Sequence, residues 1–195
     1  MNRRLFVIAL MFIQGCLYGI DFLDSLANHI QDNLPTLEFD EIEEIIEANK
    51  GGLMELQEEV LLVDKKYKES EDPRVRTMIQ LWKAAAFSGE EKSIHFAESA
   101  YELARIEQND LLEFRALYRI GAEYYMKNQT PEALDYYYKC KDHLSQIDEI
   151  YTIKLNLAFG LVYVRLGNRD GAKEVFDKNL DFLSLIHISE PTRPY

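Results

Sequence analysis

Apolar side chains in residues 116–140 recur at the spacing of two consecutive α-helices and not at the alternation of a β-strand. The first apolar face consists of Leu117, Ile120, Tyr124 and Tyr125. Asn128 begins a polar break, after which Thr130 is expected to cap a second helix with Pro131 at its first helical position. The pattern therefore predicts two helices folded back on each other as a hairpin.

The same hairpin pattern returns 39 positions further along the chain, as the two glycines show (160 − 121 = 39). Four residues of the first hairpin match residues of the same kind in the second, namely Gly121 and Gly160, Tyr124 and Tyr163, Ala133 and Ala172, and Tyr137 and Phe176. Because glycine and alanine leave room for a neighbouring helix, we expect these eight residues to pack the repeats together.

This combination of small and aromatic residues resembles the tetratricopeptide repeat, although the period of 39 residues is a few residues longer than the standard one. A weaker copy lies upstream, where Gly89 ends a helix and Ser93, Ala97 and Ala100 take the small positions. The resemblance covers residues 73–182. It implies an all-α fold, in which tandem antiparallel helical hairpins of about three repeats form a right-handed α-solenoid.

Residues 20–72 precede the repeats and have helical patterns of their own. An acidic stretch that begins at Asp40 places Ile42, Ile45 and Ile46 on one face, and the acids in its first turn complement the helix dipole. We expect these helices to form a cap or a degenerate repeat. Their acidic residues are interpreted as a solvated face, because no loop has the ligand spacing of a calcium site.

Residues 1–19 have the pattern of a secretory signal peptide. Two arginines precede an apolar run, residues 5–13, that is too short to span a bilayer comfortably, and small residues follow it. A buried N-terminal helix is the alternative. Cys16 after Gly15 also fits a bacterial lipoprotein cleavage site, at which lipidation would anchor the protein. We expect an exported protein that is periplasmic or membrane-anchored.

Residues 183–195 depart abruptly from the repeat pattern. Read back into codons, residues 183–193 resemble a translated transposase adapter of the kind used to prepare sequencing libraries. We expect this tail to be non-native, so that the native chain continues differently after Phe182. A natural disordered tail is the alternative.

The formal net charge of −12 argues against nucleic acid and anionic membrane surfaces as partners of the folded part. The two cysteines, Cys16 and Cys140, give no disulfide framework, and Cys140 falls on the inner side of a second helix. The four histidines form no metal pair, and no glycine-rich phosphate loop is present. We therefore expect no metal, no cofactor and no enzymatic activity, with membrane contact only through a lipid anchor or a downstream span.

In tetratricopeptide arrays the first helix of each hairpin lines a concave groove that holds peptides. The corresponding positions here are Arg115, Tyr118, Ala122, Tyr125 and Met126, then Lys154, Leu157, Leu161, Val164 and Arg165, and in the weaker copy Arg76, Ile79, Lys83 and Phe87. The resemblance implies a groove whose candidate binding residues are Arg115, Tyr118, Tyr125, Lys154 and Arg165. Basic and aromatic groups suit an extended peptide with acidic groups or a free carboxylate, and ordinary solvated or inter-repeat positions are the alternative.

The sequence thus favours a non-enzymatic scaffold that binds a protein or peptide partner. One alternative is the N-terminal sensory region of a truncated signalling protein, with a histidine kinase or nucleotide cyclase domain downstream. A third interpretation is a component of an outer-membrane assembly or secretion system. A hydrophobic span of about twenty residues beyond Phe182 in the native gene would favour the sensor.

Overall fold

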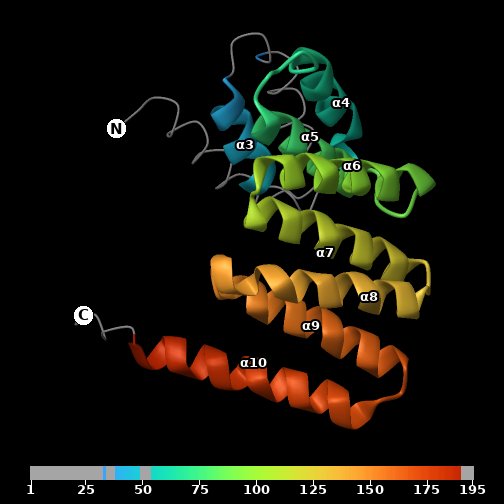
Figure 1. The fold of residues 1–195 in the computed structure, drawn as a ribbon, viewed down its shortest axis with the longest axis vertical. Coiled ribbons are helices and arrows are strands. Elements are labelled where there is room, and N and C mark those ends of the chain that lie inside the picture. The colour runs from blue at the N-terminus through green and yellow to red at the C-terminus, as the bar shows by residue number, and fades with distance from the viewer. Residues whose placement is uncertain (1–32, 34–37, 49–53, 190–195) are drawn as a thin grey trace, which may run out of the picture. The chain divides into compact units, whose positions relative to one another are not determined.

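The computed structural model describes residue 33 and residues 38–48 and 54–189, and this part of the chain is all-α and contains no strand. The helices are α3 (Phe39–Ala48), α4 (Gln57–Lys66), α5 (Pro73–Ala86), α6 (Glu91–Glu107), α7 (Asp110–Met126), α8 (Thr130–Cys140), the 3-10 helix η2 (Lys141–Gln146), α9 (Ile150–Arg165) and α10 (Arg169–Ser189) (Figure 1). The predicted signal peptide and Cys16 lie outside the described residues. The backbone of α10 continues past Phe182 to Ser189.

The chain divides into two compact units, Met1–Ser99 and Ala100–Tyr195. In the first unit, α4 packs on α5, and Gln57 donates a hydrogen bond from Nε2 to the carbonyl oxygen of Ala86 at 2.8 Å. Phe39 of α3 stacks on Trp82 of α5 with ring centroids 5.4 Å apart. Arg74 forms an ion pair with Glu43, so charged as well as aromatic contacts hold α3 to α5.

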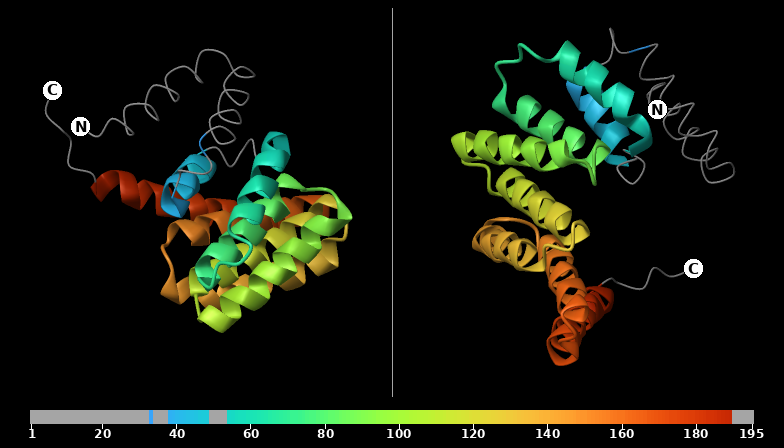
Figure 2. Two further views of the ribbon diagram at one scale, coloured as in Figure 1. Left: turned by 90° about the horizontal axis from the view of Figure 1, so that it is seen from above. Right: turned by 90° about the vertical axis from the view of Figure 1, so that its right-hand side faces the viewer.

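The second unit contains two helical hairpins that pack in sequence order. The most extensive helix contacts join α7 to α8 and α9 to α10, and α8 in turn packs on α9. Figures 1 and 2 show each hairpin as two helices side by side with a short turn between them. The prediction of an all-helical fold built from neighbouring helix pairs is therefore confirmed.

Short-range sequence signals fix where these helices begin and end. Asn109 caps α7, since its Oδ1 accepts a hydrogen bond from the backbone N–H of Leu112 at 3.1 Å. Gly89, with φ +87°, ends the turn after α5 in a conformation that glycine adopts at little cost. The expected cap of α8 is wrong by one residue: the helix begins at Thr130 itself, and Gln129 precedes it without a side-chain capping bond.

A close contact between a glycine and an aromatic ring closes each hairpin of the second unit. A Cβ atom added at Gly121 of α7 would lie 2.6 Å from Cε1 of Tyr137 on α8. Likewise, a Cβ atom at Gly160 of α9 would overlap the ring of Phe176 on α10. The glycine–aromatic contact of the first hairpin thus recurs 39 positions later in the second hairpin, with Phe176 in the place of Tyr137.

The core of the second unit lies where α7, α8 and α9 meet. Its buried members are Phe114, Leu117, Ala133, Tyr137, Cys140, Leu155, Ala158, Phe159 and Val162. Half-buried tyrosines surround them, so aromatic rings supply much of the packing. In the part of the chain that the structure describes, no helix is long and apolar enough to cross a membrane.

Candidate interaction surface

Two helices that are 39 residues apart in the sequence, α7 and α9, lie in contact and run in the same direction. Near their N-termini, Tyr151 of α9 meets Phe114 of α7 edge to face, with ring centroids 5.2 Å apart. Near their C-termini, the guanidinium of Arg165 lies 3.5 Å from the ring centroid of Tyr125. Contacts at both ends fix the two helices as parallel neighbours, so equivalent residues of the two repeats stand beside one another.

The α7 row, which we define as Arg115, Tyr118, Ala122 and Tyr125, is half-buried. Tyr118 stacks on Phe114 with centroids 5.9 Å apart and also contacts Tyr137. Burial raises the pKa of Tyr118, because the phenolate form would lose its hydration. The structure therefore places Tyr118 at the edge of the core, with part of its ring at the surface.

Arg165 and Tyr125, two of the predicted binding residues, contact each other. The guanidinium of Arg165 covers the Tyr125 ring and also donates a hydrogen bond to the Tyr125 carbonyl oxygen. This pair, the Arg165 latch, joins the C-terminal turns of α7 and α9. A partner that approaches the surface here meets a guanidinium that is already oriented by a ring beneath it.

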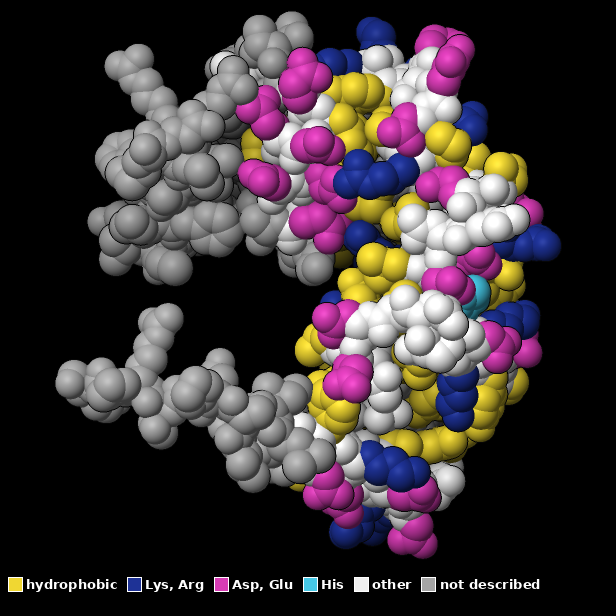
Figure 3. All heavy atoms as spheres, turned by 60° about the vertical axis from the view of Figure 1, so that its left-hand side comes forward, with side chains coloured by type: hydrophobic (Ala, Val, Ile, Leu, Met, Phe, Trp, Pro, Cys, Tyr) yellow, Lys and Arg dark blue, Asp and Glu magenta, His cyan; other side chains and the backbone are white. Residues whose placement is uncertain are grey.

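The α9 row, which we define as Lys154, Leu157, Leu161 and Val164, is exposed. Leu157, Leu161 and Val164 leave 48%, 44% and 58% of their surfaces accessible, and Lys154 is exposed beside the ring of Tyr151. On the face of the molecule that Figure 3 shows, hydrophobic side chains reach the surface between charged ones. In α9 an apolar stripe of one residue per turn therefore faces outward, with a cation at each end.

In the weaker upstream copy, the prediction of an exposed binding row is wrong. Arg76 is exposed, but Ile79, Lys83 and Phe87 are buried. The physical reason is that α4 packs on α5, where Lys83 forms an ion pair with Asp64 of α4, with Nζ 2.8 Å from Oδ2. The Lys83 ammonium also lies 4.4 Å from the ring centroid of Phe96, so this cation is part of the core of the first unit.

The remaining residues of the repeat pattern lie around the same core. Ala133 and Ala172 are buried, and Tyr124 stacks on Tyr136 with centroids 5.5 Å apart. Tyr163 is half-buried, and its hydroxyl lies 3.5 Å from that of Tyr138. This hydrogen bond, together with partial burial, raises the pKa of Tyr163 to about 12.

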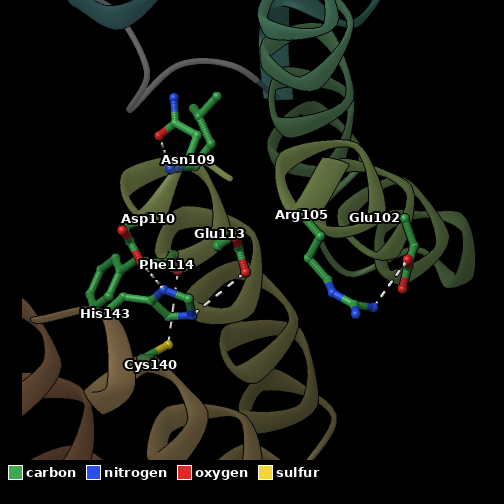
Figure 4. A network of polar contacts seen from close by, with 9 residues as sticks. Glu102, Arg105, Asn109, Asp110, Glu113, Phe114, Cys140 and His143 are labelled. Carbon is green, nitrogen blue, oxygen red and sulfur yellow. Dashed lines mark hydrogen bonds and ion pairs between the residues drawn. The ribbon is translucent and has the colours of Figure 1, made fainter. Parts of the chain in front are cut away.

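A polar cluster that the sequence did not reveal joins η2 to the start of α7 (Figure 4). The mostly buried ring of His143 points at the first turn of α7, with Nδ1 2.8 Å from Oδ1 of Asp110 and Nε2 3.9 Å from Oε2 of Glu113. Asp110 and His143 are 33 residues apart, and neither helical period nor motif spacing connects them. These contacts hold η2, which follows α8, against the first turn of α7.

Cys140 lies beside this cluster and is fully buried, as its place on the inner side of a second helix predicts. Its Sγ faces the carbonyl oxygen of Phe114 at 3.9 Å. Burial raises the pKa of the thiol, because the thiolate would lack solvation. Cys140 is therefore a packing residue and a poor nucleophile.

Among the described residues, no group of three His, Cys, Asp or Glu side chains is placed to hold a metal ion. Comparison of the whole chain with protein-family models gives no match, and a search of curated proteins finds no significant relative. The geometry of the two rows is thus the main guide to function.

Proposed function

We propose that this chain is a non-enzymatic protein–protein interaction module that binds its partner on the adjoining α7 and α9 rows. One observation carries the proposal. The same sequence of a cation followed by apolar residues recurs on two parallel neighbouring helices, and on α9 it stands exposed to solvent. Exposed apolar stripes with charged ends are typical of surfaces that bind other proteins.

The charges favour an acidic partner. Arg115 and Lys154 occupy equivalent positions at the start of the two rows, and Arg165 stands at the far end. These three cations belong to two neighbouring helices of a chain whose net charge is −12. A carboxylate that reached this surface would gain charge-assisted hydrogen bonds, which are about twice as strong as neutral ones.

The wider architecture and location are part of the same proposal. Stacking of hairpins in the manner of tetratricopeptide arrays would form a right-handed α-solenoid, and the two rows would then line its concave groove. Export, through the signal pattern of residues 1–19, would place this surface in the periplasm or at a membrane. The partner would then be another exported protein or a segment of one.

Photo-crosslinking tests the proposal directly. A benzophenone amino acid at Leu161, in the middle of the α9 row, is expected to crosslink one distinct protein in native cell extract. The same label at Leu61 of α4, which is equally exposed at 45%, is the matched control. The captured protein, once identified and purified, is expected to bind the unlabelled chain.

Charge reversal then identifies the surface. The double substitution Arg115→Glu with Lys154→Glu is expected to weaken that binding at least about tenfold, since two attractive contacts become repulsive. Circular dichroism checks that the helices remain. Unchanged affinity in a folded double variant would rule out the α7 and α9 rows as the binding surface.

A further inference from the structure

We infer that the segment captured by the α9 row is an acidic amphipathic α-helix and not an extended peptide. The inference rests on the proposed function and specifies its partner. Between its two cations the α9 row presents apolar side chains at helical spacing and no outward side chain that donates or accepts a hydrogen bond. A helical partner therefore takes the place of the extended acidic peptide that the sequence resemblance implies.

The backbone of a bound peptide must find hydrogen-bond partners. Between Lys154 and Arg165, the outward residues of the α9 row are Leu157, Leu161 and Val164, whose side chains have no donor or acceptor. The nearest side-chain amide on α9, Asn156, donates to Asn179 of α10 at 2.9 Å. An extended chain laid on this stripe would lose hydration of its N–H and C=O groups without compensation, whereas a helix satisfies its own.

The spacing of the stripe also matches a helix. Leu157, Leu161 and Val164 are related as i, i+4 and i+7, which is the pattern by which one helix packs along another. Their half-exposed side chains form a ridge of about two turns. A partner helix with apolar residues at the same intervals would cover that ridge along its whole length.

The charges at the two ends select the partner and argue against a second copy of α9. Lys154 and Arg165 are 11 residues apart, about 16 Å along the helix axis. Antiparallel pairing of two α9 helices would bring lysine against arginine, and parallel pairing would bring each cation against its own kind. A helix with carboxylates about three turns apart, one near each end of its apolar face, meets both cations with opposite charge.

A displayed peptide library tests this partner class. The probe is a phage library of random peptides about 20 residues long, enough for five helical turns, panned on the full-length protein. Each binder is then measured against a double variant, Leu157→Ser with Leu161→Ser. Leu61→Ser with Leu62→Ser on α4 is the matched control, because it removes two leucines that are also exposed, at 45% and 37%.

We expect binders that lose at least about tenfold in affinity on the α9 variant and keep it on the α4 variant. Their sequences are expected to repeat apolar residues at helical spacing with acids near both ends. A proline placed in the middle of such a binder is expected to weaken binding at least about tenfold, because it interrupts the helix. Thermal melts verify that both variants remain folded.

The other outcomes separate the inference from the proposed function. Binders that depend on Leu157 and Leu161 but tolerate the central proline and lack helical periodicity would overturn the helical partner and leave the interaction surface in place. Binders that keep their affinity for the α9 variant and lose it for Arg115→Glu would move the site to the α7 row and overturn the inference. Binders indifferent to both rows would overturn the inference and the proposed function together.

Discussion

Tyr163 shows at the scale of a single residue how a contact between hairpins changes ionisation. Its hydrogen bond with Tyr138, together with its partial burial, raises its pKa to about 12, above the ordinary value of about 10. The folded-state pKa is the higher one, so this contact stabilises the fold fully below pH 10. Its contribution decreases above pH 10 and is lost as the pH rises through about 12.

We therefore expect Tyr138→Phe to lower the pKa of Tyr163 toward 10, because the hydrogen-bond partner is gone. Carbon-13 labelling of the tyrosine rings allows each resonance to be followed through an NMR titration. Tyr136→Phe is the control, since Tyr136 stacks on Tyr124 and leaves the hydroxyl pair in place. An unaltered Tyr163 titration in Tyr138→Phe would show that the hydroxyl contact does not set the shift.

The two glycine–aromatic contacts give a second prediction for single residues. At Gly121 a methyl group would lie 2.6 Å from Tyr137, whose ring is only 3% exposed. Overpacking typically costs about 1–3 kcal/mol, whereas replacing glycine by alanine in a helix gains at most about 1 kcal/mol. We expect Gly121→Ala to reduce the free energy of unfolding by about 1–2 kcal/mol, and Gly160→Ala by less, because Phe176 is only half-buried.

Chemical denaturation measures both glycine variants. Ala122→Gly, at the half-buried neighbouring position, isolates the helix-propensity term, which is about 1 kcal/mol. A Gly121→Ala protein more stable than the wild type would mean that Tyr137 moves aside at no cost, and the close contact would then not constrain the hairpin.

At the scale of the helices, the Arg165 latch holds the last turns of α7 and α9 together. The substitution Arg165→Ala removes the cation–π contact and the hydrogen bond to Tyr125. We expect it to lower the free energy of unfolding by about 0.5–1 kcal/mol, because the site is exposed. Amide hydrogen exchange is expected to accelerate in both last turns. Arg169→Ala at the start of α10 is the control; equal exchange in the two variants would mean that the latch does not couple the helices.

How much the sequence predicts depends on the range of the contact. Gly121, Tyr137 and their counterparts at +39 are visible as a repeat, and the helices have clear periodicity, so the all-helical paired fold could be predicted. The burial of Lys83 could not, because it follows from how α4 packs on α5 and not from the pattern of α5 itself. The cluster of His143 with Asp110 likewise joins residues that no local rule relates.

For the candidate surface, the sequence identified the composition of the rows but not the degree of exposure of each residue. Lys154 and Arg115 occupy equivalent positions of the repeat, yet Lys154 is exposed and Arg115 is half-buried. The difference arises because α9 packs beside α7. Packing between elements, which sequence periodicity does not report, therefore decides which row is exposed to solvent.

At the scale of the whole molecule, net charge and local charge act in opposite directions on binding. The chain has a net charge of −12 and repels an acidic partner at a distance, whereas Lys154 and Arg165 attract it on contact. Salt screens both effects. For an acidic helical binder from the library, we expect the association rate constant to rise several-fold between 0.05 and 0.5 M salt, and the dissociation rate constant to rise as well.

Surface plasmon resonance at several salt concentrations separates these two rate constants. A neutral library binder of the same length is the control, since its association rate should change little. If the association rate of the acidic binder instead falls with salt, the cations of the surface dominate the encounter, and the net charge of the chain has no part in it.

The burial of Cys140 has a practical consequence for measurements on this protein. Its thiol stays protonated and covered, so maleimide dyes will not label it in the folded chain. Once Cys16 is replaced by serine, dyes attach only to cysteines introduced at exposed positions. A pair of such sites, one at Leu61 and one at Leu180, would report by fluorescence energy transfer the distance between chosen points of the two units in solution.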